Sequence, residues 1–403
     1  MMRIGTKFLF DQGMMEMQRQ QASVARTQQQ ISSGRRVLTP ADDPIAAAET
    51  LRTAQAQDMN TQYERNQTSA KNRLSITEGT LTTITDLYQQ IRTSLIQTGN
   101  GSYADQDRGA VASALLSNYQ ELIGLANATD GGGNYLFAGN LEKSTPFSAT
   151  AAGAVYNGDQ GQRLLQVADS RQIAVGDNGS ALFERIGTGN GVFVTAVASG
   201  NSGSAGIDLG VVTNPAAVTG HNYRIAFSVA AGVTTYDVTD TTAATTLSAG
   251  NAYTDGAAIS FDGMRVAVSA LPNNGDAFTL GPSTHQSIFA TLANAITLLQ
   301  TSTATPGAHP KLNVGLMQSL ANLDNAFETL QTTHTEVGTR LAELDTLSAV
   351  NADMKVIYGE QQSRQGAVDY ASAISDLTLG QMALTAAQQS YAKVTKLTLF
   401  DFI

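Results

Sequence analysis

Two stretches of this chain, one toward each end, carry large side chains on a seven-residue repeat. Intervals of four and three residues keep a single stripe of an α-helix facing a partner helix, as in a coiled coil. The first stretch holds Leu74, Leu81, Ile84, Tyr88, Ile91 and Leu95, and the second holds Leu316, Leu320, Leu323, Phe327, Leu330, His334, Val337, Leu341 and Leu344. The natural partner of each stripe is the other one, about 250 residues away. The sequence therefore predicts two helical arms that fold back on each other.

The segment between the arms is rich in glycine, threonine and β-branched residues, and it reads as strands separated by turns. Asp262-Gly263, between two short apolar runs, is typical of a two-residue hairpin turn. The candidate strands are Leu164–Ala168, Val192–Ala198, Asn222–Val229, Thr234–Thr239 and Met264–Ala270. We therefore expect an α+β fold. Its long N- and C-terminal helices pair in a coiled-coil or helical-bundle rod, and an antiparallel β-rich domain is inserted between them.

Start and stop signals for helices divide the arms further. Pro44 at the first helical position and Gly99 after the last predict one helix of about 80 Å, too long for a compact globule. The expected helices are Asp11–Ser33, Pro44–Thr98, Ala104–Thr129, Thr284–Leu299, Lys311–Ile357 and Ala367–Leu397. These boundaries give three domains: terminal coiled-coil helices in 1–40 plus 360–403, a helical rod domain in 41–140 plus 284–359, and a β-rich outer domain in 141–283.

Composition excludes several classes of protein. The 403 residues include no cysteine, so the chain has no disulfide framework, thiolate zinc site or cysteine nucleophile. A net charge of −10 disfavours binding to nucleic acid. The apolar run Phe8-Leu9-Phe10 ends at Asp11 and is too short for a secretory signal, and no run approaches a membrane-spanning helix. We expect no membrane insertion, and either a cytoplasmic protein or one exported without a cleaved signal.

The outermost helices have weaker apolar stripes than the inner ones. Gln21 and Gln28 fall among the expected contact positions of the first helix, and Gln381 and Gln388 among those of the last. Such a pair buries little apolar area to offset the entropy of ordering its backbone, so we expect loosely ordered ends that pack against other copies or a related protein. The candidate assembly residues are Phe8, Leu9, Met17, Val24, Ile31, Arg35, Ile374, Leu377, Leu384, Tyr391, Leu399, Phe400 and Phe402. An ordinary bundle, whose terminal helices dock on their own chain, remains the alternative.

The acidic pair Asp42-Asp43 stands directly before Pro44. Two adjacent carboxylates suggest acid–base or metal chemistry, but this position favours capping of the following helix, and no histidine or third acid lies nearby in sequence. The basic pair Arg35-Arg36 is equally compatible with an anionic partner surface and with a solvated turn.

The remaining polar motifs favour structural roles. Gly131-Gly132-Gly133 lacks the lysine of a phosphate-binding loop, and His334 has no second histidine at helical spacing. Asp237 and Asp240 lack the rest of a calcium loop. No catalytic set stands out, so we expect neither an enzyme nor a cofactor or metal site.

Several segments, in the same order along the chain, resemble a known family. Ile31–Pro44 (ISSGRRVLTPADDP) is similar to a segment of bacterial flagellin-like proteins. The details resemble the hook-associated protein 3 (FlgL-type) family within that superfamily: Met2-Arg3-Ile4, Gln18–Gln21, Tyr135–Gly139 with Thr145-Pro146-Phe147, Gly275–Phe278 before Ser287-Ile288-Phe289, Val337–Leu341 and the tail Leu399–Phe402. Thr339, in place of a small alanine, and the terminal Ile403 depart from the family pattern.

The resemblance implies a structural component of the bacterial flagellum, a junction between hook and filament located outside the cell. It implies export by the flagellar type III route, assembly in a ring with copies of itself, and contact with hook-associated protein 1 and flagellin. It also implies an export chaperone on the C-terminal helix. The alternatives are the flagellin filament subunit and, in another class, a secreted adhesin or glycan-binding protein.

Overall fold

The computed structural model describes residues 6–99 and 103–396 of the chain. Its contacts divide the chain into two compact units. The terminal unit contains the residues up to Arg65 and those from Thr346 onward, and the central unit contains Asn66–Asp345. Each unit is described separately below.

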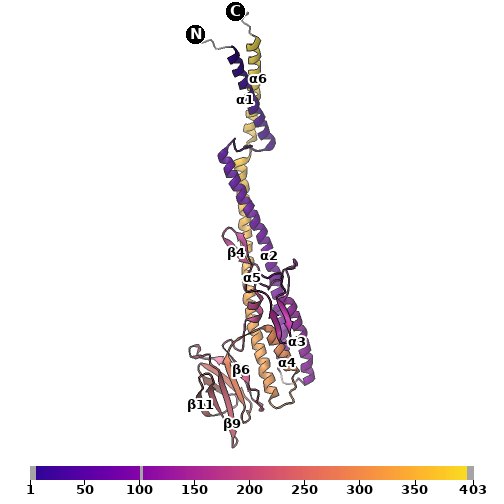
Figure 1. Cartoon of the computed structure of the whole chain (residues 1–403), viewed down its shortest axis with the longest axis vertical. Helices are drawn as coiled ribbons and strands as arrows, with labels where there is room; N and C mark the ends of the chain where they lie inside the picture. Colours follow the sequence, from indigo (N-terminus) through magenta and orange to yellow (C-terminus); the bar gives the residue numbers. More distant parts are fainter. Residues whose placement is uncertain (1–5, 100–102, 397–403) are drawn as a thin grey trace, which may run out of the picture. The chain divides into compact units, whose positions relative to one another are not determined.

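Six α-helices form the helical part of the described chain, and two of them contribute to both units (Figure 1). They are α1 (Thr6–Ser33), α2 (Pro44–Thr98), α3 (Asp105–Ala126), α4 (Ile288–Gln300), α5 (Ala308–Gly366) and α6 (Tyr370–Lys396). The bounds of α2 are those expected from the sequence, because Asp43-Pro44 starts the helix and Gly99 stops it. Helix α5 continues past the expected end at Ile357 as far as Gly366.

The strands all belong to the central unit and pair in antiparallel fashion. They are β1 (Phe147–Thr150), β2 (Gly153–Tyr156), β3 (Leu164–Ala168), β4 (Arg171–Ala174), β5 (Ile186–Gly187), β6 (Phe193–Val197), β7 (Gly206–Ile207), β8 (Val211–Val212), β9 (Tyr223–Ala230), β10 (Val233–Asp240), β11 (Thr245–Ala252), β12 (Ala258–Phe261), β13 (Met264–Ser269), β14 (Ala277–Pro282) and β15 (His285–Gln286). The α+β prediction, with an antiparallel β-rich region between long helices, is confirmed.

The two largest sheets share one hydrophobic core. The five-stranded sheet has the order β11-β10-β9-β14-β6, and the other has the order β12-β13-β7, with β8 also paired to β13. Phe193, Ile225, Phe227, Val268 and Phe278 are all buried between them. This packing accounts for the alternation of buried and exposed residues along β9 and β13.

Two tight hairpins fix the register of these sheets. Phe261 pairs with Met264 across Asp262 and Gly263, whose φ angles are 43° and 74°, so the predicted hairpin turn is confirmed. Ala230 likewise pairs with Val233 across the exposed turn Ala231-Gly232, with φ angles of 50° and 81°. Positive φ at both central residues matches the right-handed twist of the flanking strands.

The inner apolar stripes are buried in the central unit. Leu74, Leu81, Ile84, Ile91 and Leu330 each have less than 1% of their surface exposed. Arg92 Nε lies 2.8 Å from Asp324 Oδ1, and Lys71 Nζ pairs with Asp345, so α2 and α5 run antiparallel here. The predicted pairing of the two arms is therefore observed within this unit.

A cluster of aromatic rings joins the helices of the central unit to its first strands. The ring of Phe147 on β1 lies 5.3 Å from that of Phe183 and 5.1 Å from that of Phe289 on α4. Phe183 belongs to a single π-helical turn, η1 (Ser180–Glu184), and its ring also meets that of Phe137. Phe137 and Phe147, from the Tyr135–Gly139 and Thr145–Phe147 motifs, thus serve packing.

Candidate functional site

The paired helices α1 and α6 of the terminal unit are the candidate functional site. They run antiparallel, so that Phe10 meets Tyr391 with ring centroids 6.0 Å apart, while Gln20 Nε2 donates to the carbonyl of Gly380. Figure 1 shows the two helices side by side. The contact positions repeat at intervals of three and four, as the sequence predicted.

Small residues bring the two helices close together. A Cβ atom built on Gly380 would lie 3.0 Å from Val24 Cγ2, and one on Gly13 would lie 3.2 Å from the Tyr391 ring. Each helix therefore places a large side chain over a glycine of the other. This arrangement is a knobs-into-holes seam with very small holes.

Half of the expected seam is placed correctly and half is shifted by one residue. Met17, Val24, Leu377, Leu384 and Tyr391 are half-buried at the seam, as is Ile31. The intervening positions are Gly13, Gln20 and Thr27 on α1 and Ala373, Gly380 and Ala387 on α6, whereas Gln21, Gln28, Gln381 and Gln388 are exposed. The expectation was wrong there because it took the intervals of three and four in the opposite order, which placed every second contact one residue too far along the chain. Ile374 lies off the seam with 53% of its surface exposed.

The other candidate residues lie near the two ends of the chain. Phe8 is 62% exposed. The side chain of Leu9, and the residues Leu399, Phe400 and Phe402, lie outside the described residues.

Substituting Gly380 tests the seam directly. We expect Gly380→Leu to force α1 and α6 apart, because the new side chain meets Val24 at once, at a cost of about 1–3 kcal/mol in pairing free energy. Amide hydrogen exchange across α1 should then accelerate. Gly359→Leu is the control, since a Cβ atom there meets nothing within 4 Å. Unchanged exchange in Gly380→Leu would contradict this packing.

A compact turn connects α1 to α2 and is tied to the connection between α5 and α6. Arg35 and Ala367 form an antiparallel bridge, flanked by a bond of 2.8 Å from Arg36 N to Gly366 O and one of 3.1 Å from Val368 N to Gly34 O. Gly34 has a φ angle of +68°, and a Cβ atom there would lie 3.0 Å from Tyr370 Oη. The Arg35 side chain is exposed.

The acidic pair organises this turn. Asp43 Oδ1 accepts from Ala46 N at the start of α2, while its Oδ2 lies 3.1 Å from Arg36 Nη1. Asp42 Oδ2 accepts from the backbone of Thr39 and Leu38. Hydrogen bonds from the backbone, led by Thr39 for Asp42 and by Ala46 for Asp43, hold the pKa of both carboxyls below the ordinary value of 3.8. Both carboxylates are engaged in the turn, which leaves neither poised for proton transfer.

Because the pKa values of Asp42 and Asp43 are lowered in the folded protein, the stability of this turn should depend on pH. A carboxyl whose pKa is depressed by folding stabilises the fold above its ordinary pKa, and that contribution is lost as the pH falls through the folded value. We expect the Asp42→Asn/Asp43→Asn variant to exchange the amides of Thr39 and Ala46 faster than the parent at about pH 6. The difference should shrink below pH 3.8, the ordinary value. If the variant still exchanges these amides faster than the parent at acidic pH, the effect comes from the changed shape of the side chains and not from the loss of their charge.

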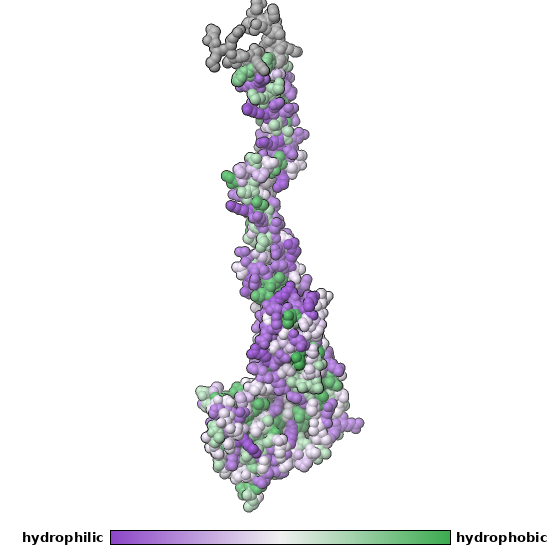
Figure 2. All heavy atoms as spheres, in the orientation of Figure 1, coloured by the Kyte–Doolittle hydropathy of each residue, from purple (hydrophilic) through white to green (hydrophobic). Residues whose placement is uncertain are grey.

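The terminal unit also exposes much apolar surface. More than half of the exposed large hydrophobic side chains in the described residues belong to it, although it is the smaller unit. Figure 2 shows hydrophobic residues, in green, on the outer surface of its helices. They are Phe8, Met14, Met15, Ile45, Leu51, Met59, Val350, Val356, Ile357, Tyr370, Ile374, Leu379 and Met382. On α6, Met382 lies opposite the seam, about 200° around the helix from Gly380 and from Leu384. Apolar surface of this extent is typical of an interaction site.

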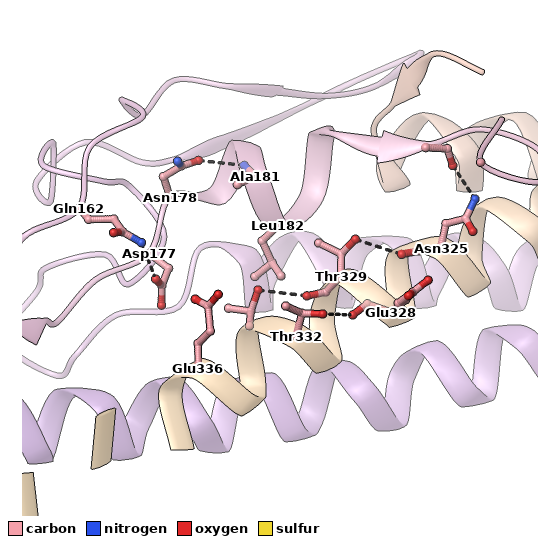
Figure 3. A pocket seen from close by; sticks show the side chains of 13 residues that line it. Gln162, Asp177, Asn178, Ala181, Leu182, Asn325, Glu328, Thr329, Thr332 and Glu336 are labelled. Carbon is pink, nitrogen blue, oxygen red and sulfur yellow. Dashed lines mark hydrogen bonds between the residues drawn. The ribbon is translucent and has the colours of Figure 1, made fainter. Parts of the chain in front are cut away.

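The central unit has a cavity of about 510 Å³ whose lining includes the polar side chains of Asp177, Thr329 and Thr332 (Figure 3). Asp177 is held there by Arg340, at 2.9 Å, and by Gln162. Thr329 and Thr332 donate to the carbonyls of their own helix. Across residues 6–99 and 103–396, no group of three His, Cys, Asp or Glu side chains is placed to hold a metal ion.

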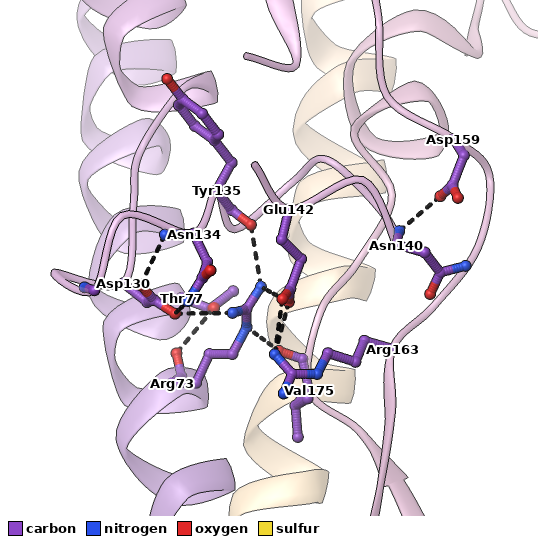
Figure 4. Close-up of polar contacts among 11 residues, drawn as sticks. Arg73, Thr77, Asp130, Asn134, Tyr135, Asn140, Glu142, Asp159, Arg163 and Val175 are labelled. Carbon is purple, nitrogen blue, oxygen red and sulfur yellow. Dashed lines mark hydrogen bonds and ion pairs between the residues drawn. The ribbon is translucent and has the colours of Figure 1, made fainter. Parts of the chain in front are cut away.

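A second polar cluster of the central unit surrounds Arg73 on α2 (Figure 4). Its guanidinium lies 2.9 Å from Asp130 Oδ2 and 2.8 Å from Glu142 Oε1, and it donates to the carbonyls of Val175 and Tyr135. Only 7% of the Arg73 side chain is exposed. This cluster fastens the 130–142 segment and the end of β4 to α2.

Comparison with known proteins links these features to the flagellum. A model of the bacterial flagellin N-terminal helical region matches residues 5–142, and a model of the D2-like domain of flagellar hook-associated protein 1 matches residues 196–282. Flagellar hook-associated protein 3 of Salmonella typhimurium is 27% identical over 99% of both chains.

Two solved structures from Legionella pneumophila are similar over their whole length. Flagellar hook associated protein-3 is 30% identical, covers 77% of this chain and 97% of its own, and superposes with a TM-score of 0.73. A structure of the flagellar junction protein FlgL is also 30% identical, covers 79% of this chain and 100% of its own, and has a TM-score of 0.71. Within its described part, this chain has no helix long and apolar enough to cross a membrane.

Proposed function

The chain belongs to the flagellar hook-associated protein 3 family, and from this premise we propose that it is a structural component of the flagellum at the junction of hook and filament. The observation that carries the proposal is the terminal unit. Its paired helices bury almost no side chain completely, and thirteen large apolar side chains of the unit are exposed. A surface of this kind needs neighbouring molecules to cover it.

We further propose how the protein assembles. The terminal helices, in 1–40 plus 360–403, form the inner layer of a ring with copies of the same chain. Residues 41–140 plus 284–359 form the helical rod domain, and the β-rich domain in 141–283 faces outward. Phe8, Arg35, Ile374 and the seam residues of α1 and α6 are the proposed assembly contacts.

The proposed partners follow from the same premise. Hook-associated protein 1 lies on the hook side of the ring and flagellin on the filament side. The chain reaches this place outside the cell through the flagellar type III route, and an export chaperone covers α6 before export. The role includes no catalytic step, cofactor or nucleic acid.

A gene deletion tests the junction role. We expect intact hooks and unpolymerised flagellin in the medium, because filament growth lacks its base. Loss of the major filament subunit would instead support the flagellin alternative. Binding of residues 150–280 to a glycan array, with filaments unaffected by the deletion, would support the adhesin alternative.

Complementation of that deletion tests the role of the α1–α6 seam. We expect Gly380→Leu to fail to restore filaments, and Gly359→Leu to restore them, because only the first substitution meets Val24. Secretion of both variants into the medium must be equal, so that export is not the cause of the difference.

Dependence of the terminal helices on neighbours can be measured on the free chain. We expect hydrogen exchange in α1 and α6 of the monomer to be much faster than in the α2 stripe around Leu81 and Ile84, which is completely buried. Equal protection would contradict the proposed assembly dependence.

A further inference from the structure

In the terminal unit, α2 packs against α5 with one side and exposes a second set of regularly spaced residues on the other. The side that faces α5 includes Thr53 and Asn60, which are both buried and bond to that helix. On the opposite side, residues at intervals of three and four form an outer stripe, since an α-helix turns by about 100° per residue. They are Ile45, Ala48, Arg52, Gln55, Met59 and Gln62, and all six are exposed.

Helix α5 has an outer stripe of the same kind. Its members are Ala349, Asp353, Val356, Glu360 and Ser363, and all five are exposed. They lie about 120–200° around the helix from Asn351, which is buried against α2. Each helix of the pair therefore has two stripes with coiled-coil spacing, one used within the chain and one facing outward.

The apolar members of the two outer stripes lie at the same height. Asn60 bonds to Asn351 and Glu64 pairs with Lys355, which places Met59 level with the turn of α5 around Val356. Met59 is 47% exposed and Val356 is 61% exposed. A hollow of about 590 Å³ lies beside Met59, and its lining also includes Gln55, Asp58, Thr61, Gln62 and Arg65. The α2 stripe thus offers a recess next to its apolar side chain, and the α5 stripe offers a protruding apolar side chain at that level.

The two outer stripes also differ in charge. The α2 stripe contains one cation, Arg52, and no acid, whereas the α5 stripe contains two acids, Asp353 and Glu360, and no cation. In the part of the chain that the structure describes, neither Arg52 nor Asp353 forms an ion pair. Glu360 pairs with Arg364, but both side chains are more than half exposed. The contacts between the helices place Arg52 within about one turn of the level of Glu360.

From this complementarity we propose that the outer stripe of α2 packs against the outer stripe of α5 in the next copy of the ring. The inference rests on the proposed ring assembly and names the surfaces that form it. Copies related by rotation about one axis lie at the same height, so the match seen within one chain is preserved between neighbours. Val356 of one copy then meets Met59 of the next, and Glu360 comes within reach of Arg52. Because the two faces differ, the contact is heterologous and can close into a ring, whereas a self-complementary face stops at a dimer.

Cysteine cross-linking in isolated flagella tests this contact, since the chain contains no cysteine of its own. The full-length Met59→Cys/Val356→Cys variant is expressed in the gene deletion. Within one copy these two positions lie on opposite sides of the helix pair, with Cα atoms about 13 Å apart, which is too far for a disulfide. Disulfides can therefore form only between copies. After oxidation we expect a ladder of covalent oligomers larger than dimers, because each copy is joined to two neighbours.

The matched control is Met59→Cys/Ser363→Cys, which keeps both cysteines on the two outer stripes but moves one of them about 10 Å along α5. We expect it to give at least about fivefold less oligomer, because a disulfide requires closely spaced Cα atoms. The single variants Met59→Cys and Val356→Cys should give no ladder. Covalent dimers of Met59→Cys alone would show that α2 faces α2 and would overturn the proposal. Restored filaments without a ladder in the double variant would overturn the contact and leave the junction role intact, whereas absence of the parent chain from flagella would overturn both.

Exchange of charges tests the same contact without cysteine and decides the matter if the double-cysteine variant does not assemble. Arg52→Glu and Glu360→Arg alone should each lower the fraction of cells with filaments at least about twofold, because like charges then face each other between copies. Arg52→Glu/Glu360→Arg should recover most of that loss, with secretion of all three variants equal. Failure of the double variant to recover filaments would overturn the proposed contact.

Discussion

Replacing Arg73 by alanine is expected to lower the free energy of unfolding of the central unit by about 3–5 kcal/mol. The substitution removes the buried cation beside the carboxylates of Asp130 and Glu142, whose side chains are 15% and 16% exposed, and leaves Glu142 with only its more exposed partner Arg163. It also leaves the carbonyls of Val175 and Tyr135 without this donor. Urea unfolding followed by circular dichroism measures the loss.

The pKa of Asp130 shows how closely this cluster is balanced. Burial works to raise that pKa, but hydrogen bonds from Asn134 and Gly132 and the charge of Arg73 outweigh it, so the pKa lies below its ordinary value. Removing Arg73 removes part of that compensation. The pKa of Asp130 should then rise toward its ordinary value, which carboxyl NMR can follow.

Arg171→Ala is the control for Arg73→Ala. Arg171 also makes a close pair with a carboxylate, Glu343, but 54% of its side chain is exposed. Solvent screens such a pair, so we expect a loss within about 1 kcal/mol. Equal losses for the two variants would show that burial is not what makes the Arg73 cluster important.

Replacing Asp276 by alanine is expected to destabilise the sheets of the central unit by about 2–4 kcal/mol. The carboxylate is 2% exposed and accepts from three backbone amides, those of Ser202, Gly203 and Asn273, at 2.8, 3.0 and 2.8 Å. Alanine leaves all three donors without this acceptor. The midpoint of urea unfolding should fall accordingly.

Two further variants test whether the lost hydrogen bonds cause the destabilisation of Asp276→Ala. Asp276→Asn keeps one acceptor oxygen, so we expect an intermediate loss. Asp255→Ala removes an exposed carboxylate that accepts from Ala270 N, and should change stability by less than about 1 kcal/mol. If Asp255→Ala costs as much as Asp276→Ala, the buried donors are not the cause.

Local signals in the sequence were sufficient for the helices and for several strands. Asp43-Pro44 and Gly99 bound α2, β3 occupies the expected residues Leu164–Ala168, and Asp262-Gly263 forms the expected turn. These features depend on neighbouring residues, whose preferences can be read directly.

Pairing between distant segments, and contacts made by small residues, could not be predicted from the preferences of neighbouring residues. The segment Ala277–Pro282 was not among the expected strands, yet it forms β14 between β6 and β9. In the Arg73 cluster, Arg73 contacts residues that are at least 57 positions away in the sequence. No pattern among neighbouring residues predicts such contacts. Gly380 and Ala373 lie at the α1–α6 seam, but residues this small do not stand out in a search for repeats of large apolar side chains.

The hairpin turn at Ala231-Gly232 offers a practical site for labelling. Both residues are exposed, and the flanking pair Ala230–Val233 closes the ladder before the chain reverses. A short epitope inserted between them lengthens a loop at a small entropic cost and disturbs no ladder hydrogen bond. Gold-conjugated antibody against such an epitope would let electron microscopy locate the chain along a flagellum without altering the terminal helices.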